Sequence, residues 1–327
     1  EVFCSGTPRR VRTAVRGGNT QRITVRYCEG DASSVMDGVP RRSKTSAEAD
    51  VLERYRFRPD ASMPKHLNIF FVGDINGRPG LNLVTTVLKQ YIQKYEIDFC
   101  FVNGENTTEG KSISEEDAKV LFGLGVHVIT TGNHLWDRWQ VKKLLEKERN
   151  LLRPLNYPRE NPGYGFVVYD LKEKGRVGVM NVQGRTYMQP IDDPFKSADW
   201  AVSKIANDTK VILIDMHAEA TAEKMAFAWH LDGRVSAIVG THTHIPTADA
   251  RILPNGTAYI TDVGMTGPYD SVIGMKKEIA IRRFIHQTPY KFEIAEHDVR
   301  MCAVYIQVDT ETGKATKIEQ VIFPSFG

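Results

Sequence analysis

Residues Leu67–Asp74 read LNIFFVGD, a short apolar run that stops abruptly at a carboxylate. The same arrangement recurs downstream in Asp98–Asn106, DFCFVNGEN, and in Val126–His134, VHVITTGNH. Apolar runs of this length are typical of strands buried on both faces, as in sheets that helices cover. The pattern therefore predicts an α/β fold whose strands end in polar, metal-capable residues.

Strand-like and helix-like segments alternate from Met63 onward. Helical periodicity covers Leu81–Tyr95, and Ser114 with Asp117 resembles a capping box that opens a helix ending near Gly123. We predict one α/β domain over residues 63–327, with mixed sheets and no internal repeat. The other expected strands are Arg176–Val182, Val211–Asp215, Ser236–Val239, Thr257–Thr261 and the hairpin Met301–Asp309 with Lys317–Phe323, and the other expected helices are Val141–Glu148 and Ala222–His230.

Residues 1–62 differ in composition from the rest of the chain. They carry 11 Arg, 1 Lys and 8 acidic residues, whereas residues 63–327 carry 12 Arg, 19 Lys and 32 acidic residues. The segment lacks sustained periodicity, which predicts disorder, and its acidic residues argue against a transit peptide. Our hypothesis is that the natural start is Met63 and that residues 1–62 are a disordered or non-native extension. The intact mass of the native protein tests this.

The overall composition is that of a soluble globular protein, with 41% hydrophobic and 25% charged residues in 327. A net charge of +3 is too small to argue for nucleic acid or an acidic membrane as a partner. The four cysteines form no CxxC pair, which favours buried thiols in a reducing compartment. With neither an 18-residue apolar stretch nor a secretory h-region, we expect a cytoplasmic protein without a membrane partner.

Metal-capable side chains stand at the ends of successive expected strands. In open α/β sheets this edge, at the carboxyl ends of the strands, is where ligands bind. Carboxylate, amide and imidazole donors without a thiolate suit Fe, Mn or Zn, and eight such residues exceed what one ion needs. Glu105 is our choice for a ligand that bridges two ions, because a carboxylate has two oxygens. The eight residues are Asp74, Glu105, Asn106, Asn133, His134, His217, His242 and His244.

Single residues of this set also have structural explanations, namely a helix cap, a turn, a solvated loop or a satisfied core histidine. These explanations apply one by one to Asp74, Glu105, Asn106, Asn133 and His217. They suit His242 and His244 less well, since an extended segment would point both rings to one side as a metal clip. The joint occurrence of all these residues in this order favours a metal centre.

Four motifs, Gly73-Asp74, Asn103-Gly104-Glu105-Asn106, Gly132-Asn133-His134 and Gly240-Thr241-His242-Thr243-His244, resemble the signature blocks of calcineurin-like metallophosphoesterases. The resemblance is strongest to the bacterial YmdB-like branch, known as 2′,3′-cyclic-nucleotide 2′-phosphodiesterases. Supporting blocks lie at 181–186, 215–221 and 259–268. The resemblance covers residues from Leu67 to Phe323 and has no counterpart for residues 1–62.

The resemblance implies a four-layer α/β/β/α sandwich with a two-metal centre, in which Fe is expected and Mn or Zn are alternatives. The first metal would be held by Asp74, Glu105, Asn106 and His244, and the second by Glu105, Asn133, His217 and His242, with Glu105 bridging. His134 would be the catalytic proton donor to the leaving oxygen. The expected reaction is hydrolysis of a 2′,3′-cyclic nucleotide to a 3′-nucleotide by metal-hydroxide attack.

Two other functions stay open at this point. One is a phosphomonoesterase or phosphoprotein phosphatase of the same fold. The other is a metal-binding regulatory, RNA-associated protein with little turnover, which the near-neutral charge of residues 63–327 weakens. RNA ends and a homo-oligomer also stay open as partners. Arg138, Arg185 and Arg251 flank the motifs, and surface ion pairing is the expected fate of each taken singly.

Overall fold

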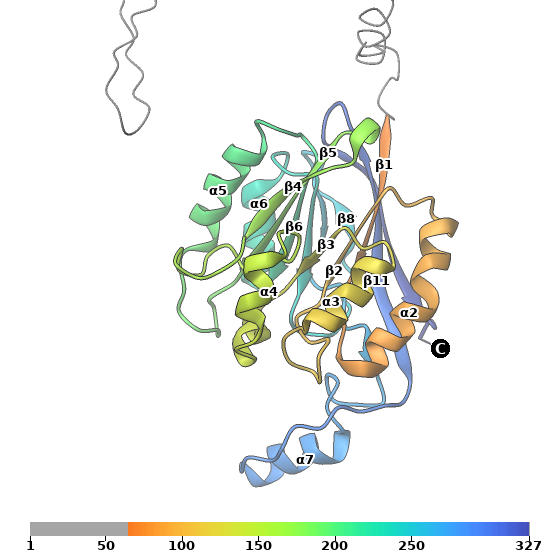
Figure 1. Cartoon of the computed structure of the whole chain (residues 1–327), viewed down its shortest axis with the longest axis vertical. Coiled ribbons are helices and arrows are strands. Elements are labelled where there is room, and N and C mark those ends of the chain that lie inside the picture. Colours follow the sequence, from red (N-terminus) through yellow and green to blue (C-terminus); the bar gives the residue numbers. More distant parts are fainter. Residues whose placement is uncertain (1–64, 327) are drawn as a thin grey trace, which may run out of the picture. The chain divides into compact units, whose positions relative to one another are not determined.

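The computed structural model describes residues 65–326. The predictions for residues 1–62 and for a start at Met63 concern residues outside this range. Residues 65–326 contain two mixed β-sheets of six strands each, with helices on their outer faces (Figure 1). The expected α/β fold with mixed sheets is confirmed.

The first sheet has the order β10-β11-β1-β2-β3, and β12 pairs with β11. Strands β1, β2 and β3 run parallel, whereas β11 is antiparallel to β1, β10 and β12. The parallel strands therefore end at one edge of the sheet. The strands are β1 (His66–Val72), β2 (Phe99–Asn103), β3 (Val128–Thr130), β10 (Gly267–Pro268), β11 (Val299–Asp309) and β12 (Ala315–Phe323).

The second sheet has the order β4-β5-β6-β7-β9-β8. Its four inner strands β5, β6, β7 and β9 are parallel, and the two edge strands are antiparallel to their neighbours. The strands are β4 (Phe166–Asp170), β5 (Arg176–Gln183), β6 (Ile212–His217), β7 (Ala237–Thr241), β8 (Arg251–Ile252) and β9 (Ala258–Ile260).

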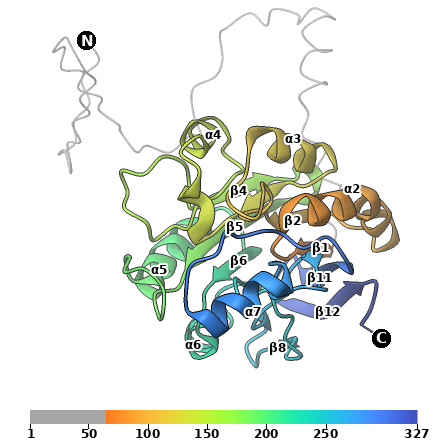
Figure 2. The same ribbon diagram turned by 90° about the horizontal axis from the view of Figure 1, so that it is seen from below.

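Alternating side chains of the strands build three apolar layers. Phe70 and Val72 of β1 face outward and belong to the same core cluster as Leu81 of the helix α2 (Gly77–Lys94). Ile69 and Phe71 point the other way, into a cluster shared with the second sheet. A third cluster joins the outer face of the second sheet to α5 and α6. Helix, sheet, sheet and helix thus stack in four layers (Figures 1 and 2), and each fully buried Phe, Leu or Ile contributes roughly 1.5–3 kcal/mol.

The helices are α2 (Gly77–Lys94), α3 (Glu115–Gly123), α4 (Val141–Lys147), α5 (Pro194–Ile205), α6 (Thr221–Leu231) and α7 (Lys277–His286), with 3-10 turns η1 (Asn133–Asp137) and η2 (Lys172–Lys174). The expected cap of α3 forms in one direction: the Ser114 hydroxyl accepts from the Asp117 amide at 3.1 Å. The Asp117 carboxylate does not complete the box, because it contacts Thr108 and Arg78 instead.

The strands β4, β8 and β10 and the helices α5 and α7 were not predicted from the sequence. Helix α5 begins at Pro194 directly after Asp193, whose carboxylate accepts from the amides of Phe195 and Lys196 at 2.9 and 3.2 Å. Asp followed by Pro is a recognised helix start, since the proline has no amide to satisfy. Helix α7 was not predicted, although half of its residues are apolar; these face solvent for the most part, and Ala280 is its one buried residue.

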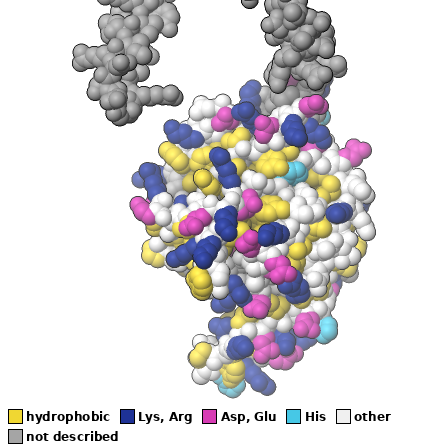
Figure 3. All heavy atoms as spheres, viewed as in Figure 1, with side chains coloured by type: hydrophobic (Ala, Val, Ile, Leu, Met, Phe, Trp, Pro, Cys, Tyr) yellow, Lys and Arg dark blue, Asp and Glu magenta, His cyan; other side chains and the backbone are white. Residues whose placement is uncertain are grey.

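The surface carries mixed charge. On the face seen in Figure 3, Lys and Arg side chains alternate with Asp and Glu rather than forming a single-sign stripe. Helix α7 projects from the end of the sheets (Figure 1), with every residue from 281 to 290 exposed. Within residues 65–326, helices long and apolar enough to span a membrane are absent.

Candidate metal centre

The predicted site residues all lie at the carboxyl ends of strands or in the turns that follow directly. Strands β1, β2 and β3 of the first sheet and β6 and β7 of the second contribute to the set, so the two sheets meet at the site. Asp74 follows β1, Glu105 and Asn106 follow β2, Asn133 and His134 open η1 after β3, His217 ends β6, and His242 and His244 follow β7.

Three of the other predicted site residues lie close to His217 Nε2. It lies 3.0 Å from Glu105 Oε1, 3.0 Å from Asn133 Oδ1 and 3.1 Å from His242 Nδ1. One ring nitrogen donates at most one hydrogen, so hydrogen bonding cannot satisfy all three neighbours. The donor atoms of Glu105, His217 and His242 lie within 4.8 Å of one another. A cation among these lone pairs would satisfy them together.

The tautomer of His217 is set by its other ring nitrogen. The Thr241 hydroxyl donates its single hydrogen to Asp215 Oδ1 at 2.7 Å. It therefore accepts from His217 Nδ1, which lies 2.9 Å away. Nδ1 carries a hydrogen, and Nε2 is left as the metal-facing nitrogen, an arrangement typical of metal-bound histidines.

His242 and His244 are oriented in the same manner. His242 Nε2 lies 3.0 Å from the Glu219 carboxylate, and His244 Nδ1 lies 2.9 Å from the Ile273 carbonyl oxygen. Both oxygens only accept, so the contacting nitrogens carry the hydrogens. The remaining nitrogens, Nδ1 of His242 and Nε2 of His244, are free to act as ligands. Each of the three imidazoles thus turns its second ring nitrogen toward the other predicted ligands.

Asp74, Asn106 and His244 form a second group beside Glu105. His244 Nε2 lies 3.3 Å from Asn106 Nδ2 and 4.0 Å from Asp74 Oδ2. Asp74 Oδ1 and Asn106 Oδ1 are both buried without a hydrogen-bond partner in the described part of the chain. A buried carboxylate oxygen left in this state is costly. These orphaned oxygens fit a cation, and the residues present therefore fit metal binding.

Charge in the metal-free pocket is shared between Glu105 and His217, both fully buried. Burial alone would lower the pKa of His217, but the Glu105 carboxylate outweighs it and raises that pKa to about 9. Burial alone would raise the pKa of Glu105, but His217 lowers it to about 2. Burial raises the pKa of Asp74. Without a cation, a proton on His217 therefore balances the charge of Glu105, and a bound cation would take the place of that proton.

The extended segment that would point the rings of His242 and His244 to one side does not form. Their φ angles are +98° and +68°, so both adopt left-handed backbone conformations, which cost about 1–3 kcal/mol for a residue other than glycine. An extended strand would send both rings to one side. The left-handed turns instead direct His242 toward His217 and His244 toward Asn106.

His134 lies at the rim of this cluster, with a side chain 39% exposed. Its backbone amide donates to Glu105 Oε2 at 3.2 Å, and its Nδ1 lies 3.1 Å from Asp137 Oδ2. The Asp137 carboxylate orients the ring and leaves Nε2 available for another partner. His134 therefore differs from the three buried or nearly buried histidines of the cluster, because its ring is accessible from solvent.

Sequence reasoning overlooked the residues that orient the ligands. Asp215 is buried and accepts from Asn103 Nδ2, Thr130 Oγ1 and the Thr241 hydroxyl at 2.8, 2.5 and 2.7 Å. Glu219 contacts His242. Both lie within two residues of His217, so the acidic residues around that histidine were the available signal.

Replacing Glu219 with Gln tests this orientation directly. The neutral amide of the introduced glutamine would accept a weaker hydrogen bond from His242 Nε2 than the Glu219 carboxylate does. The tautomer of His242 with its hydrogen on Nε2 would therefore be less strongly favoured. We expect metal affinity to fall about 10- to 100-fold, as for other partners of metal-bound histidines, measured by competition with a chromophoric chelator. Glu278→Gln on the exposed helix α7 is the matched control and should bind metal as the parent does.

The sequence model of the family described as "YmdB-like protein" matches residues 70–321. The chain belongs to the YmdB-like family. The resemblance inferred from the motifs is confirmed, and the match spans every predicted site residue.

Relatives of this YmdB-like chain have names that agree with the chemistry of the site. A 2′,3′-cyclic-nucleotide 2′-phosphodiesterase of Bacillus subtilis is 46% identical over 257 residues, which is 78% of this chain and 97% of the relative. A putative phosphatase/phosphodiesterase of Mycoplasma pneumoniae is 38% identical over 266 residues, covering 79% and 94%.

Solved structures show the same fold. A hypothetical protein from Thermus thermophilus aligns with a TM-score of 0.74 at 40% identity, covering 79% of this chain and 99% of that one. A phosphatase from Mycoplasma pneumoniae aligns with a TM-score of 0.75 at 37% identity, covering 80% and 94%. The named relatives place the YmdB-like chain among hydrolases of phosphoric esters.

The three flanking arginines do not contact the cluster. Arg138 pairs with Glu109, and Arg185 pairs with Asp193 at 3.0 Å, as expected for surface ion pairs. Arg251 does not follow that expectation, because its guanidinium lies over the ring of Tyr259 at 5.5 Å.

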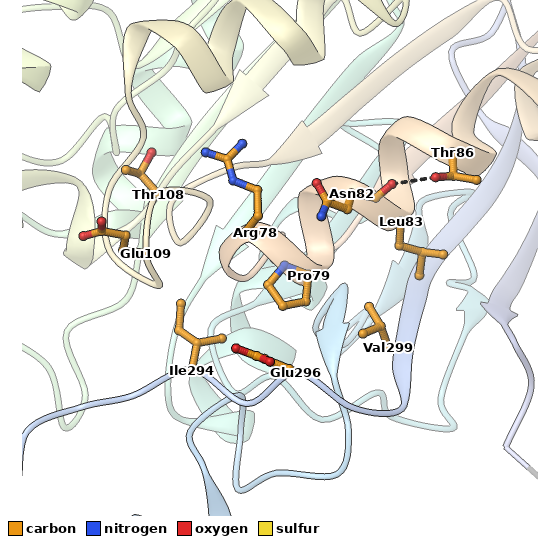
Figure 4. Close-up of a pocket in the computed structure, with 10 residues that line it drawn as sticks. All are labelled: Arg78, Pro79, Asn82, Leu83, Thr86, Thr108, Glu109, Ile294, Glu296 and Val299. Atoms are coloured by element: carbon orange, nitrogen blue, oxygen red, sulfur yellow. Dashed lines mark hydrogen bonds between the residues drawn. The ribbon is translucent and has the colours of Figure 1, made fainter.

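A cavity of about 710 Å³ lies apart from the predicted ligands of this YmdB-like chain (Figure 4). It opens between the first turns of α2, the turn at Thr108 and Glu109, and the segment from Ile294 to Val299. None of the eight predicted site residues lines it. The cavity therefore borders the loop that carries Glu105 and Asn106 without containing the proposed chemistry.

Proposed function

We propose that this chain hydrolyses 2′,3′-cyclic nucleotides to 3′-nucleotides at a centre of two metal ions. The observation that carries the proposal is the convergence of imidazole nitrogens with carboxylate and amide oxygens from five strand ends. The activity named for the Bacillus relative supplies the substrate class. The two buried oxygens without partners support the presence of cations.

The proposed ligands divide into two groups that share Glu105. The first metal would be held by Asp74, Glu105, Asn106 and His244, and the second by Glu105, Asn133, His217 and His242. The set contains oxygen and nitrogen donors and no thiolate, which suits Fe, Mn or Zn, and Fe is our choice. When bound, such a pair of ions stabilises the charge of the attacking and leaving oxygens in a phosphoryl displacement.

The role proposed for His134 is protonation of the leaving oxygen. Hydrolysis of the cyclic ester adds a water oxygen to phosphorus, breaks the bond to the 2′ oxygen and requires one proton on that oxygen. Asp137 holds Nδ1 of His134, so Nε2 is the nitrogen that would deliver the proton. The ring is exposed at the rim, where a substrate arriving from solvent reaches it.

A phosphomonoesterase activity is the second candidate, because the Mycoplasma pneumoniae relatives are named as a phosphatase or as a phosphatase/phosphodiesterase. Both activities would use the same ligands and differ in the substrate pocket. A phosphomonoester has one ester bond, so its hydrolysis releases inorganic phosphate. A 2′,3′-cyclic phosphate has two ester bonds, so hydrolysis of the 2′ bond leaves a 3′-phosphate on the nucleoside.

The experiment compares 2′,3′-cyclic AMP with 3′-AMP and p-nitrophenyl phosphate on the metal-loaded protein. We expect kcat/KM to be highest for the cyclic nucleotide, with 3′-AMP as the accumulating product in chromatography. Release of inorganic phosphate from 3′-AMP at a comparable rate would favour the monoesterase. Turnover at background with both metals bound would favour a regulatory role instead.

A further inference from the structure

A buried ion pair stands directly behind the turn that carries His242 and His244. Lys224 of α6 and Asp262, which follows β9, are each about 1% exposed, and Lys224 Nζ lies 2.8 Å from Asp262 Oδ2. Neither residue is among the proposed ligands. Burial of two charges is expensive unless further hydrogen bonds complete the pair, so the contacts around it show what the pair holds.

Three of those contacts go to the two residues that flank His242, and a fourth goes to Gly264. Lys224 Nζ donates to the Thr241 carbonyl at 2.6 Å. Asp262 Oδ2 accepts from the amide and the hydroxyl of Thr243 at 3.0 and 2.7 Å, and Asp262 Oδ1 accepts from the Gly264 amide at 2.9 Å. The pair therefore forms hydrogen bonds to the residues on both sides of His242, Thr241 and Thr243.

The turn needs such support because its backbone is strained. Both histidines have positive φ, and the residue between them is the one that Asp262 holds by two hydrogen bonds. Left-handed conformations of residues other than glycine persist only where the surroundings over-determine them. The His242 amide itself donates to Asp74 Oδ2 at 2.8 Å.

We propose that Lys224 and Asp262 form a clamp that positions His242 and His244, so that metal binding depends on two residues that touch neither ion. The proposal rests on the metal centre proposed above. The two histidines belong to different proposed metal positions. Loss of the clamp should therefore weaken both positions together, whereas loss of a single ligand weakens one first.

The test removes the clamp and measures metal binding rather than turnover alone. In Lys224→Met the Thr241 carbonyl and Asp262 lose their cationic partner. We expect affinity for Co²⁺, measured by chelator competition, to fall at least 10-fold at both positions. The visible spectrum of the bound Co²⁺ should also change, because the geometry of its imidazole ligands shifts.

Two further variants separate positioning from general stability. Leu88→Ala empties a buried position of α2 in the opposite outer layer, and should lower the unfolding midpoint while leaving Co²⁺ affinity and spectrum unchanged. Thr243→Val removes one hydrogen bond to Asp262 and keeps the ion pair, so a loss of several-fold is expected. This variant decides the matter if Lys224→Met fails to fold.

Parent-like Co²⁺ affinity and spectrum in Lys224→Met, or in Thr243→Val when the former does not fold, would overturn the clamp. A proportional loss of affinity in Leu88→Ala would also overturn it, by showing that stability alone governs binding. Failure of the parent protein to bind Co²⁺ would instead refute the metal centre itself. The two failures are therefore distinguishable.

Discussion

Glu105→Gln should lose bound metal and nearly all phosphodiesterase activity. The variant keeps the size of the side chain, but its single amide oxygen can accept only one of the two hydrogen bonds that Asn106 Nδ2 and the His134 amide donate to separate oxygens of Glu105. It removes the one charge shared by both proposed metal positions. We expect metal affinity to fall by more than about 100-fold, beyond the loss typical of an outer partner, measured by elemental analysis after dialysis.

Glu109→Gln is the matched control for this variant. Glu109 lies four residues further along the same loop, its side chain is 81% exposed, and its partner is Arg138 rather than a predicted ligand. An exposed ion pair of this kind contributes little to stability. The control should retain metal and activity. A Glu105→Gln protein with full metal content would contradict the bridging role.

His134→Ala should separate catalysis from metal binding. The contact between His134 and Glu105 is made by the backbone amide, which the substitution leaves in place. Metal content should therefore stay at the parent value. Loss of the proton donor should lower kcat for 2′,3′-cyclic AMP by about 10²- to 10⁴-fold, the usual range for a general acid, as followed by 3′-AMP formation.

His230→Ala serves as the comparison for His134→Ala. His230 has similar exposure, 38%, and pairs with Asp199 on the second-sheet side of the molecule. It should leave kcat unchanged. A His134→Ala protein that has lost metal would show that His134 is a ligand, and one with parent-like kcat would remove it from the mechanism.

The ends of the strands could be predicted because they depend on residues that are adjacent in the sequence. Apolar runs such as Leu67–Val72 have no polar alternation, and each stops where a polar residue reaches the rim of the sheet. The family resemblance assigns Glu105, Asn133, His217 and His242 to one metal, and the structure places these four residues within contact of one another. The assignment of individual ligands stays a prediction.

The parts that were missed depend on contacts between distant segments. The Ile273 carbonyl that orients His244 is a backbone group, and any residue would supply it. His242 and His244 themselves have positive φ angles, and a residue other than glycine gives no sequence signal for that conformation. Lys224 lies on the buried side of the helix α6, and only the fold shows that its ammonium group reaches Thr241 and Asp262.

Anomalous X-ray scattering from crystals of the metal-loaded protein tests the central claim most directly. Two peaks about 3.5–4 Å apart are predicted, with Glu105 between them, His244 beside one and His217 with His242 beside the other. A single peak, or peaks away from these side chains, would contradict a two-metal centre built at the meeting edge of the two sheets.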